Sequence, residues 1–425
     1  MLSRTSQSLK AARALTSSRA SLAATTAGLP TVVARSARTV SRFQAGCVQA
    51  ASPIRGFSAS AVRKDQEEST RPEINTPPSL YTFTEEEEML RETVRKFANE
   101  VVKPRVYAMD EAEQMDPDII KALFDQGTLT AQPVMPELAK VDPSISVMCD
   151  VHNTLVNSTL RLYGNEDVKA RFLPRLATDT LGSFCLSEPA SGSDAFALQT
   201  TAKLDESGIF LVFANVDPSK GYKGITCFAL EKEMGVVIAK KEKKLGIKAS
   251  STCLLSFDDV KVPKENVVGE VGKGYKIAID ILNEGRIGIA AQMIGLAQGA
   301  FDQAVTYAYS RKQFGKAVGD FQGMAFQFAD VLTEIEAARL LTYNAARLKE
   351  QGKPFVREAA MAKYYASNVA QRASGMAIEW AGGVGFTREV GLEKYWRDSK
   401  IGAIYEGTSN IQLETIAKLL KKDYV

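Results

Sequence analysis

Apolar residues follow two different spacings along the chain, and the change between them divides the chain into three parts. From residue 80 to 180, and again from 271 to 425, they recur every three or four positions, which is the spacing of a helix with one buried face. Between 181 and 270 they form short runs rich in β-branched residues, separated by Gly, Lys or Pro. We therefore expect a helical domain, a small β domain and a bundle of long helices, in that order.

The first helix has a well-marked start. Thr84, followed three residues later by Glu87, matches a capping box, in which each side chain bonds the other residue's backbone N–H. Pro104 is expected to stop or kink the helix, because proline lacks an N–H and its ring clashes with the preceding turn. Further helical spacing covers about 117–126 and 143–175. The apolar positions of the first helix are Leu90, Val94, Phe97 and Val101.

The expected strands and long helices follow from the same patterns. Each expected helix of the last part is rich in Ala and Leu and is bounded by glycine or by Gly-Lys-Pro. The runs "ITCFAL" (225–230), "GVVIAK" (235–240) and "TCLLSFDDVKV" (252–262) predict strands. Helices are expected over 285–311, 319–351, 354–381 and 408–422.

The first 64 residues differ in composition from the rest. They contain ten Lys or Arg and no Asp or Glu, and Ser, Thr and Ala dominate. This composition is typical of a mitochondrial transit peptide, although a basic arm that binds nucleic acid or membrane has a similar one. Residues 65–79 resemble a linker. Without residues 1–64 the chain has 43 basic and 50 acidic residues, which argues against a nucleic-acid-binding protein.

The residue inventory excludes several kinds of chemistry. The five cysteines form no CxxC pair, and His152 is the only histidine, so we expect neither a zinc site nor a Cys–His nucleophile. We expect reduced core thiols and a packed or surface histidine. The chain has no GxGxxG after a strand, no P-loop and no GxSxG elbow, and no run of about 18 apolar residues that would span a membrane.

Four Gly- and Ser-rich turns remain as candidates for ligand binding. They occur in "SEPASGSD" (187–194), "NEGR" (283–286), "EWAGGVGF" (379–386) and "YEGTSN" (405–410). Such turns let backbone N–H groups approach an anionic ligand, so together they favour an organic cofactor. Glu406 in the last turn is either the cap of the following helix or a functional carboxylate.

Several motifs in order resemble the acyl-CoA dehydrogenase family, and most closely its mitochondrial short/branched-chain members. The resemblance covers about 80–425, and acyl-CoA dehydrogenases have helical, β-barrel or sandwich, and four-helix-bundle domains. The matching stretches are "FCLSEPASGSDAFAL", "NEGRIGIAAQMIGLAQGAFD", "SRKQFGK", "FQGMAFQFAD", "EAARLLTYNAARL", "MAKYYAS", "EWAGGVGF" and "IYEGTSNIQLETIAK".

The resemblance implies a mitochondrial matrix enzyme that uses FAD to form a trans-2,3-double bond in a short or short-branched acyl-CoA, such as a 2-methylbutyryl- or isobutyryl-like thioester. Glu406 matches the catalytic base that removes the Cα proton, while the hydride from Cβ goes to flavin N5. A dry pocket would raise the pKa of this carboxylate toward neutrality. The implied electron acceptor is electron-transfer flavoprotein, and the implied assembly is a homotetramer.

The resemblance also assigns binding residues. One group of FAD contacts comes from the chain's own loops and another from the neighbouring subunit, so FAD binding and oligomerisation should be linked. The FAD contacts are Phe184, Cys185, Leu186, Ser187, Glu188, Pro189, Ala190, Ser191, Gly192, Ser193, Arg311, Gln322, Glu379, Trp380, Ala381, Gly382, Gly383, Thr408, Ser409 and Asn410. The acyl-CoA contacts are Ser193, Tyr222, Tyr275, Asn283, Glu284, Gly285 and Arg286.

The chain departs from the family pattern in two places. The family's Trp-Ile-Ser/Thr strand lies against the flavin, but the only tryptophans here are Trp380 and Trp396. About 15–20 residues, or two short strands, are missing between "AKLDESG" and "IFLVFANVDP". A Gly-rich "EYGG"-type segment is also missing before the helix near residue 137. Such losses open sheet edges and uncover core.

Three readings therefore stay open. The first is an active short/branched-chain acyl-CoA dehydrogenase. The second is a flavin-free, inactive chain, which either misfolds or acts only as a binding or assembly subunit. The third is an acyl-CoA oxidase, a near relative by fold, which the mitochondrial type of leader and the short chain disfavour.

Overall fold

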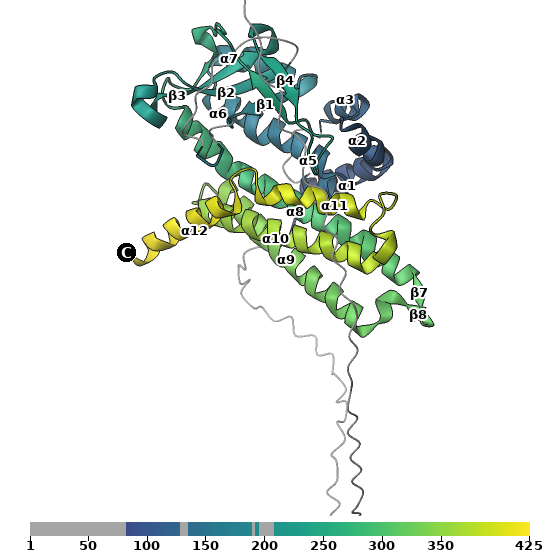
Figure 1. The fold of residues 1–425 in the computed structure, drawn as a ribbon. Helices are drawn as coiled ribbons and strands as arrows, with labels where there is room; N and C mark the ends of the chain where they lie inside the picture. Colours follow the sequence, from purple (N-terminus) through teal and green to yellow (C-terminus); the bar gives the residue numbers. More distant parts are fainter. Residues whose placement is uncertain (1–81, 128–134, 189–191, 195–207) are drawn as a thin grey trace, which may run out of the picture. The chain divides into compact units, whose positions relative to one another are not determined.

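The computed structural model describes residues 82–127, 135–188, 192–194 and 208–425. The expected transit peptide and linker lie outside the described residues. So do Pro189, Ala190 and Ser191 of the expected FAD loop. Within the described residues, helices precede and follow a small region of strands along the chain, as expected (Figure 1).

The N-terminal helices begin with the predicted capping box. Thr84 N–H donates to Glu87 Oε2 over 2.9 Å, and Glu87 N–H donates to Thr84 Oγ1 over 3.1 Å. Pro104 does not end the helical path. The chain tightens into a 3₁₀ turn there and continues as α2, because the first turn of a helix tolerates a missing N–H. The helices are α1 (Glu85–Phe97), α2 (Val106–Ala112), α3 (Pro117–Asp125), α4 (Met135–Ala139), α5 (Pro143–Asp150), α6 (Ser158–Tyr163) and α7 (Glu166–Thr178).

A four-stranded sheet follows, in the order β1-β2-β3-β6, with β1 parallel to β2 and the other pairs antiparallel. The apolar run of β2 is buried from Ile209 to Phe213, which suits a central strand. The strand predicted over 252–262 is much shorter than expected. The strands are β1 (Gly182–Cys185), β2 (Ile209–Asn215), β3 (Ile225–Glu231), β6 (Val267–Val268) and, in a separate pair, β4 (Val237–Lys241) and β5 (Cys253–Ser256).

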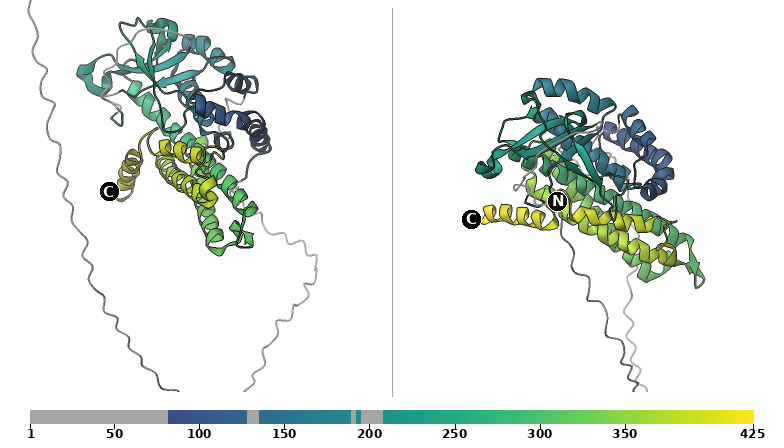
Figure 2. Two further views of the ribbon diagram at one scale, coloured as in Figure 1. Left: turned by 45° about the vertical axis from the view of Figure 1, so that its right-hand side comes forward. Right: turned by 45° about the horizontal axis from the view of Figure 1, so that its top comes forward.

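The last part consists of long helices, as predicted, but the first of them starts eleven residues earlier than 285. Ile277 and Ile281 lie in one apolar cluster with strand residues, so packing against the sheet extends the helix. This helix, α8, runs from the strand region to the β7–β8 end, beside α9 and α10 (Figures 1 and 2). The elements are α8 (Gly274–Ser310), β7 (Lys312–Gln313), β8 (Lys316–Ala317), α9 (Gln322–Glu350), α10 (Val356–Ala381), α11 (Leu392–Ser399) and α12 (Ser409–Tyr424).

A buried ion cluster connects the N-terminal helices to the end of the chain. Lys394 Nζ on α11 lies 2.9 Å from Asp142 Oδ1 and 2.6 Å from Asp398 Oδ2. Asp142 also caps α5 by accepting from Ser144 N–H, and Asp398 Oδ1 accepts from Ile247 N–H. The cluster therefore fixes three separate segments against one another.

The single histidine is buried and hydrogen-bonded, and the described cysteines are unpaired. His152 is buried, one ring nitrogen lies 2.8 Å from the Leu176 carbonyl oxygen, and Gly182 N–H donates to the other. Cys149, Cys185, Cys227 and Cys253 are free thiols. Among the described residues no group of His, Cys, Asp or Glu could hold a metal ion, and no helix is long and apolar enough to cross a membrane.

Candidate active site

Glu406 lies in a tight turn directly before α12. Its backbone is left-handed, with φ at +53°, and Gly407 follows with φ at +86°. A non-glycine residue in this region is strained, and such residues concentrate at functional sites. Thr408 then caps α12, since its Oγ1 accepts from Ile411 N–H. The helix cap is therefore Thr408, and Glu406 is left free for another role.

Two buried side chains hold the carbonyl groups of this turn. Lys363 on α10 has no exposed surface, and its Nζ donates to the Gly407 carbonyl over 2.6 Å. Gln412 on α12 is equally buried, and its Nε2 donates to the carbonyls of Glu406 and Gly407 over 3.0 and 2.9 Å. The turn is thus fixed from two helices.

The Glu406 side chain points toward α8. A Cβ added to Gly285 would lie 2.7 Å from Glu406 Oε2, so this glycine leaves space for the carboxylate. Glu406 Oε2 is buried and has no hydrogen-bond partner among the described residues. Nε and Nη1 of the adjacent Arg286 are also buried without a partner there. Unpaired buried polar groups are costly, so these three atoms suit a bound polar ligand.

Burial is the main influence on the pKa of the Glu406 carboxyl group. It raises the pKa of Glu406 to about 8, assisted by the negative charge of Asp150 and opposed by Lys363 and Arg286. Burial likewise lowers the pKa of Lys363 to about 8, although Glu406 opposes that change. A carboxyl group with a pKa near neutrality is suited to general acid–base chemistry.

Two further side chains near Glu406, Asp150 and Tyr405, are assigned no role by the sequence. Asp150, at the end of α5, is buried, and its Oδ1 accepts from Thr154 Oγ1 over 2.8 Å. Burial raises the pKa of Asp150 to about 7, against the effects of Thr154 and Lys349. Tyr405 donates its hydroxyl to Gln292 Oε1 on α8. No local motif marks Asp150, whereas Tyr405 lies within the turn "YEGTSN", in which the resemblance assigns roles only to Glu406, Thr408, Ser409 and Asn410.

Comparison with known proteins decides the family. The family model "Acyl-CoA dehydrogenase, C-terminal domain" matches residues 272–421, and the N-terminal domain model matches 84–133 and 127–180. The mitochondrial short/branched chain specific acyl-CoA dehydrogenase of Rattus norvegicus is 51% identical over 381 residues, with 81% of this chain and 88% of that protein covered. The chain belongs to the acyl-CoA dehydrogenase family.

Solved structures of the family agree with this. Butyryl-CoA dehydrogenase from Megasphaera elsdenii is 36% identical, with a TM-score of 0.77, and the match covers 80% of this chain and 99% of that one. A chain in a structure of the electron transferring flavoprotein of Acidaminococcus fermentans gives the same values. The fold is therefore that of acyl-CoA dehydrogenases.

The alignment with the rat dehydrogenase also contains gaps in this chain. It extends over 381 residues, whereas 81% of 425 residues is about 344, so about 37 aligned positions have no residue here. The N-terminal family model matches in two pieces that overlap at 127–133. Both observations agree with segments missing relative to the family.

Apart from Ser193, which follows β1, the expected acyl-CoA contacts lie on α8 and beside its start. The rings of Tyr222 and Tyr275 contact each other at a tilt of 48°, with centroids 4.7 Å apart, and Tyr222 is about half exposed. Asn283 is buried, and Glu284 forms an ion pair of 2.7 Å with Lys349 on α9. The structure therefore brings Gly285 and Arg286 to Glu406, while Glu284 is paired with another helix.

The described part of the expected FAD loop leaves the sheet at β1. Phe184 packs against Phe213 with ring centroids 5.2 Å apart, and Cys185 and Leu186 also contact apolar clusters. Beyond the strand the described residues turn outward, since Ser187, Gly192 and Ser193 are exposed and Glu188 is half-buried.

A second group of expected FAD contacts lies at the opposite end of the long helices, near β7 and β8 (Figure 1). Arg311, Gln322 and Glu379 are exposed there. Trp380 is buried against Phe301 and Phe328, and its Nε1 donates to Gln327 Oε1 over 3.0 Å. Buried Ala381, exposed Gly382 and exposed Gly383 follow, and a Cβ at either glycine would meet nothing within 4 Å.

Thr408, Ser409 and Asn410 lie close to Glu406 in the chain and start α12. Ser409 is half-buried and Asn410 is exposed, so this helix start presents polar groups directly beside the Glu406 turn. The expected FAD contacts are thus divided among β1 and the residues after it, the turn at Glu406 and the distant β7–β8 end.

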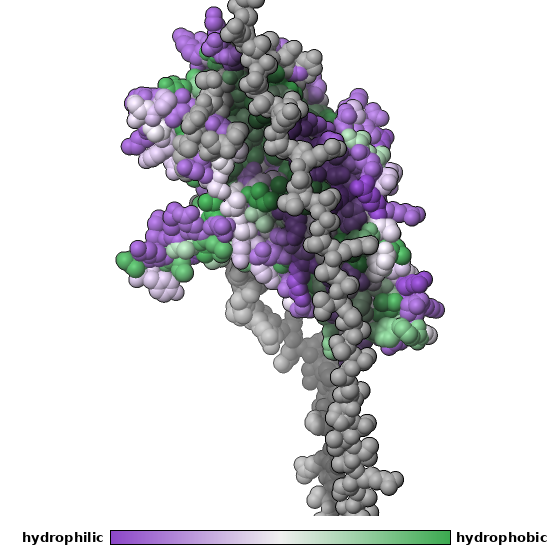
Figure 3. All heavy atoms as spheres, viewed as in Figure 1, coloured by the Kyte–Doolittle hydropathy of each residue, from purple (hydrophilic) through white to green (hydrophobic). Residues whose placement is uncertain are grey.

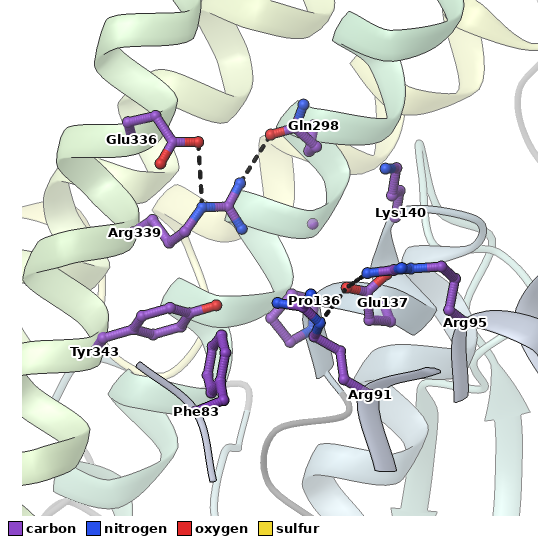
Figure 4. Close-up of a pocket in the computed structure, with 11 residues that line it drawn as sticks. Phe83, Arg91, Arg95, Pro136, Glu137, Lys140, Gln298, Glu336, Arg339 and Tyr343 are labelled. Carbon is purple, nitrogen blue, oxygen red and sulfur yellow. Dashed lines mark hydrogen bonds and ion pairs between the residues drawn. The ribbon is translucent and has the colours of Figure 1, made fainter. Parts of the chain in front are cut away.

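A cavity of about 210 Å³ lies elsewhere, between α1, α4, α8 and α9 (Figure 4). Its charges are largely paired: Arg339 lies between Glu336 and Gln298, and Glu137 faces Arg95. Gln298 is 13 residues from Gly285 along α8, or about 20 Å at 1.5 Å per residue. This cavity is therefore separate from the Glu406 site.

Proposed function

We propose that the chain is an FAD-dependent dehydrogenase of short or short-branched acyl-CoA thioesters, with Glu406 as the catalytic base. One observation carries the assignment of the base: Oε2 of the Glu406 carboxylate is buried without a hydrogen-bond partner among the described residues, and the carboxylate is held on a strained turn against Gly285 and Arg286. The printed name of the rat relative, a short/branched chain specific acyl-CoA dehydrogenase, supports the substrate class.

The described residues fit a bound flavin and thioester. The unpaired atoms of Glu406 and Arg286 supply polar groups, and the polar start of α12 lies beside them. When bound, FAD supplies the acceptor for the hydride that leaves Cβ of the substrate. Thr408, Ser409 and Asn410 would hold it near Glu406, together with the loop that includes Ser193.

In this proposal, Glu406 removes the proton from Cα of the acyl group. The thioester carbonyl acidifies this proton, and burial gives the carboxylate a basicity that an exposed glutamate lacks. The backbone N–H of Glu406 would stabilise the negative charge that develops on the thioester oxygen, and one such donor is typically worth about 10²–10³ in rate. Tyr222, Tyr275 and Asn283 would bind the rest of the acyl-CoA.

We also propose that FAD sites form between subunits of a homotetramer. Arg311 follows α8 directly, 25 residues after Arg286, which is about 37 Å along the helix. That is more than the diameter of a small domain, so Arg311 cannot serve the FAD beside its own chain's Glu406. Exposed apolar side chains at the same end, including Phe314 at 94% and Phe386 at 82%, suit contact with another subunit (Figure 3).

The remaining expectations belong to this proposal. The transit peptide at 1–64 would direct the chain to the mitochondrial matrix, and the named mitochondrial relatives support this location. The proposed domains are 80–180, 181–270 and 271–425. Electron-transfer flavoprotein would accept the electrons, which the similarity to a chain in the Acidaminococcus fermentans structure supports.

A flavin-free chain is the second candidate, and the gaps in the alignment favour it. About 37 positions of the rat enzyme have no counterpart here. If the missing residues include the Trp-Ile-Ser/Thr strand, one wall of the flavin site is absent. The chain would then act only as a binding or assembly subunit.

One experiment separates the two candidates. The visible spectrum of the purified protein should show an oxidised flavin band that bleaches anaerobically on addition of 2-methylbutyryl-CoA. Glu406→Gln should keep the band and bind acyl-CoA but stop the bleaching. Glu414→Gln is the matched control, because Glu414 is on α12 in an exposed ion pair with Lys418. A colourless, soluble oligomer would instead support the flavin-free candidate.

A further inference from the structure

Lys363 is the most unusual charged residue of the site, because its side chain is completely buried. Lysine is almost never fully buried unless it is paired. Its Nζ donates to the carbonyl oxygen of Gly407, and the negative charge that opposes the lowering of its pKa is that of the Glu406 carboxylate. The cost of burying this ammonium is high, so its position next to the turn requires an explanation.

The contacts around Lys363 all concern the segment that carries Glu406. One turn further along α10, Ser367 Oγ donates to the Gly402 carbonyl over 2.8 Å. Lys363 holds the Gly407 carbonyl, and Gln412 holds the same carbonyl from α12. This face of α10 therefore fixes both ends of the segment from Gly402 to Gly407.

We propose that Lys363 is a positioning residue for Glu406: its ammonium group, bonded to the Gly407 carbonyl, holds the left-handed turn and keeps a positive charge beside the carboxylate. The inference rests on the proposed role of Glu406 and adds a residue to it. A neutral donor could hold the carbonyl, as Gln412 does, but only a cation also opposes the effect of burial on the carboxylate.

Three other charged or titratable groups face this pair. Arg286 on α8 adds positive charge near both Lys363 and Glu406, while Asp150 on α5 adds negative charge near Glu406. Tyr405 lies in the same turn, and burial raises its pKa well above the ordinary value. Without the Lys363 charge, Arg286 would be the cation that lowers the pKa of Glu406 against the effect of Asp150.

The test compares Lys363→Met, which removes charge and donor at similar size, with Lys363→Arg, which keeps both. An opposite charge nearby shifts a carboxyl pKa by about one unit or more. Lys363→Met should therefore move the acidic limb of the bleaching rate upward by about one pH unit, and slow bleaching at pH 7 about tenfold. Lys363→Arg should restore most of the rate. Substrate KM and flavin content should change little.

A second readout does not depend on activity. Backbone amide hydrogen exchange in the peptide 404–412 should become at least about tenfold faster in Lys363→Met, because the turn loses an anchor. Ser374→Ala is the matched control: Ser374 is buried on α10, and its hydroxyl bonds Ala370 O and Ser399 Oγ, away from the turn. This control should change neither readout. If Lys363→Met is insoluble, Lys363→Gln replaces it, with the same expected loss of charge.

The outcomes separate the inference from the proposed function. If the wild-type chain bleaches and Glu406→Gln does not, but Lys363→Met keeps both the pH profile and the slow exchange, only the positioning role of Lys363 is wrong. If the wild-type chain binds no flavin, the proposed function fails, and exchange in the peptide 404–412 still decides whether Lys363 holds the turn. An acidic limb shifted equally by Lys363→Arg would also overturn the inference.

Discussion

Gly285 leaves the space that the Glu406 carboxylate occupies, so adding one methyl group there tests the geometry of the base. In Gly285→Ala the new Cβ would lie 2.7 Å from Glu406 Oε2, and the flexible carboxylate would have to move. A base displaced by about 1 Å can cost about 10²-fold in rate. We expect bleaching at saturating acyl-CoA to slow 10- to 100-fold, roughly, while thermal stability changes little.

Gly375→Ala is the matched control for this substitution. Gly375 is inside α10, and a Cβ there would meet only Trp396 Cδ1, at an ordinary 3.8 Å. Alanine favours a helix interior over glycine by about 1 kcal/mol, so this variant should be slightly more stable and equally active. Normal bleaching in Gly285→Ala would show that the carboxylate tolerates displacement, and would weaken its assignment as base.

The raised pKa of Glu406 also predicts how stability depends on pH. Burial raises this pKa from an ordinary 4.5 to about 8. Between those values the folded chain keeps a proton that the unfolded chain has released, so the free energy of unfolding falls as pH rises through this range. Glu406→Gln removes the buried charge. It should raise Tm at pH 8 by at least roughly 2 °C and have no effect near pH 4.

Scanning calorimetry of both proteins at pH 4, 6 and 8 checks this prediction. Glu414→Gln should match the wild type at each pH, because its ion pair with Lys418 is exposed. An equal change in Tm at every pH would mean that the effect of Glu406→Gln comes from packing rather than from ionisation.

At the scale of elements, α11 is connected to the N-terminal helices through the buried Lys394. Lys394→Met would leave Asp142 and Asp398 as two buried carboxylates without their cation. Removing one partner of a buried ion pair typically costs about 3–5 kcal/mol. We expect a loss of that size in urea unfolding. Lys121→Met, which removes an exposed pair with Asp125, should leave the midpoint unchanged. An unchanged midpoint in Lys394→Met would mean that the carboxylates find other partners.

The sequence predicted elements best where the apolar spacing was long and regular. It placed α9, α10 and α12 within a few residues of their ends, and it identified the capping box of α1. It missed the first eleven residues of α8, because contacts of Ile277 and Ile281 with the sheet, rather than local spacing, extend that helix. It also overestimated β5, since only the first half of the predicted run pairs with β4.

The site also contains residues that the sequence could identify and residues that it could not. Glu406 could be found because a run of family motifs marks it, and the structure places Gly285 and Arg286 beside it. Lys363 lies in the matching stretch "MAKYYAS" and Asp150 in no quoted motif, but neither could be assigned to the site, because a charged residue within a regular helical pattern is normally on the solvated face. Only the packing of α5, α8 and α10 brings these charges together around one turn.

At the scale of the whole molecule, Arg311 follows one end of α8, the longest helix among the described residues, whereas Glu406 lies against Gly285 near the other end. If each FAD takes Glu406 from one subunit and Arg311 from its neighbour, two inactive variants can complement each other. Arg311→Ala should lose FAD, because a cation on the pyrophosphate is missing, and Glu406→Gln should stop bleaching. A mixed oligomer would contain some sites in which both residues are native.

Refolding the two variants together tests this arrangement. In a random mixture, we expect bleaching activity to return to a measurable fraction of the wild-type value, whereas each variant refolded alone stays inactive. The double variant Arg311→Ala/Glu406→Gln, mixed with Glu406→Gln, is the control, because no native Glu406 is present in any site. If the FAD contacts came from one chain, no mixture would regain activity. The distance of about 37 Å between Arg286 and Arg311 along α8 is the reason to expect recovery.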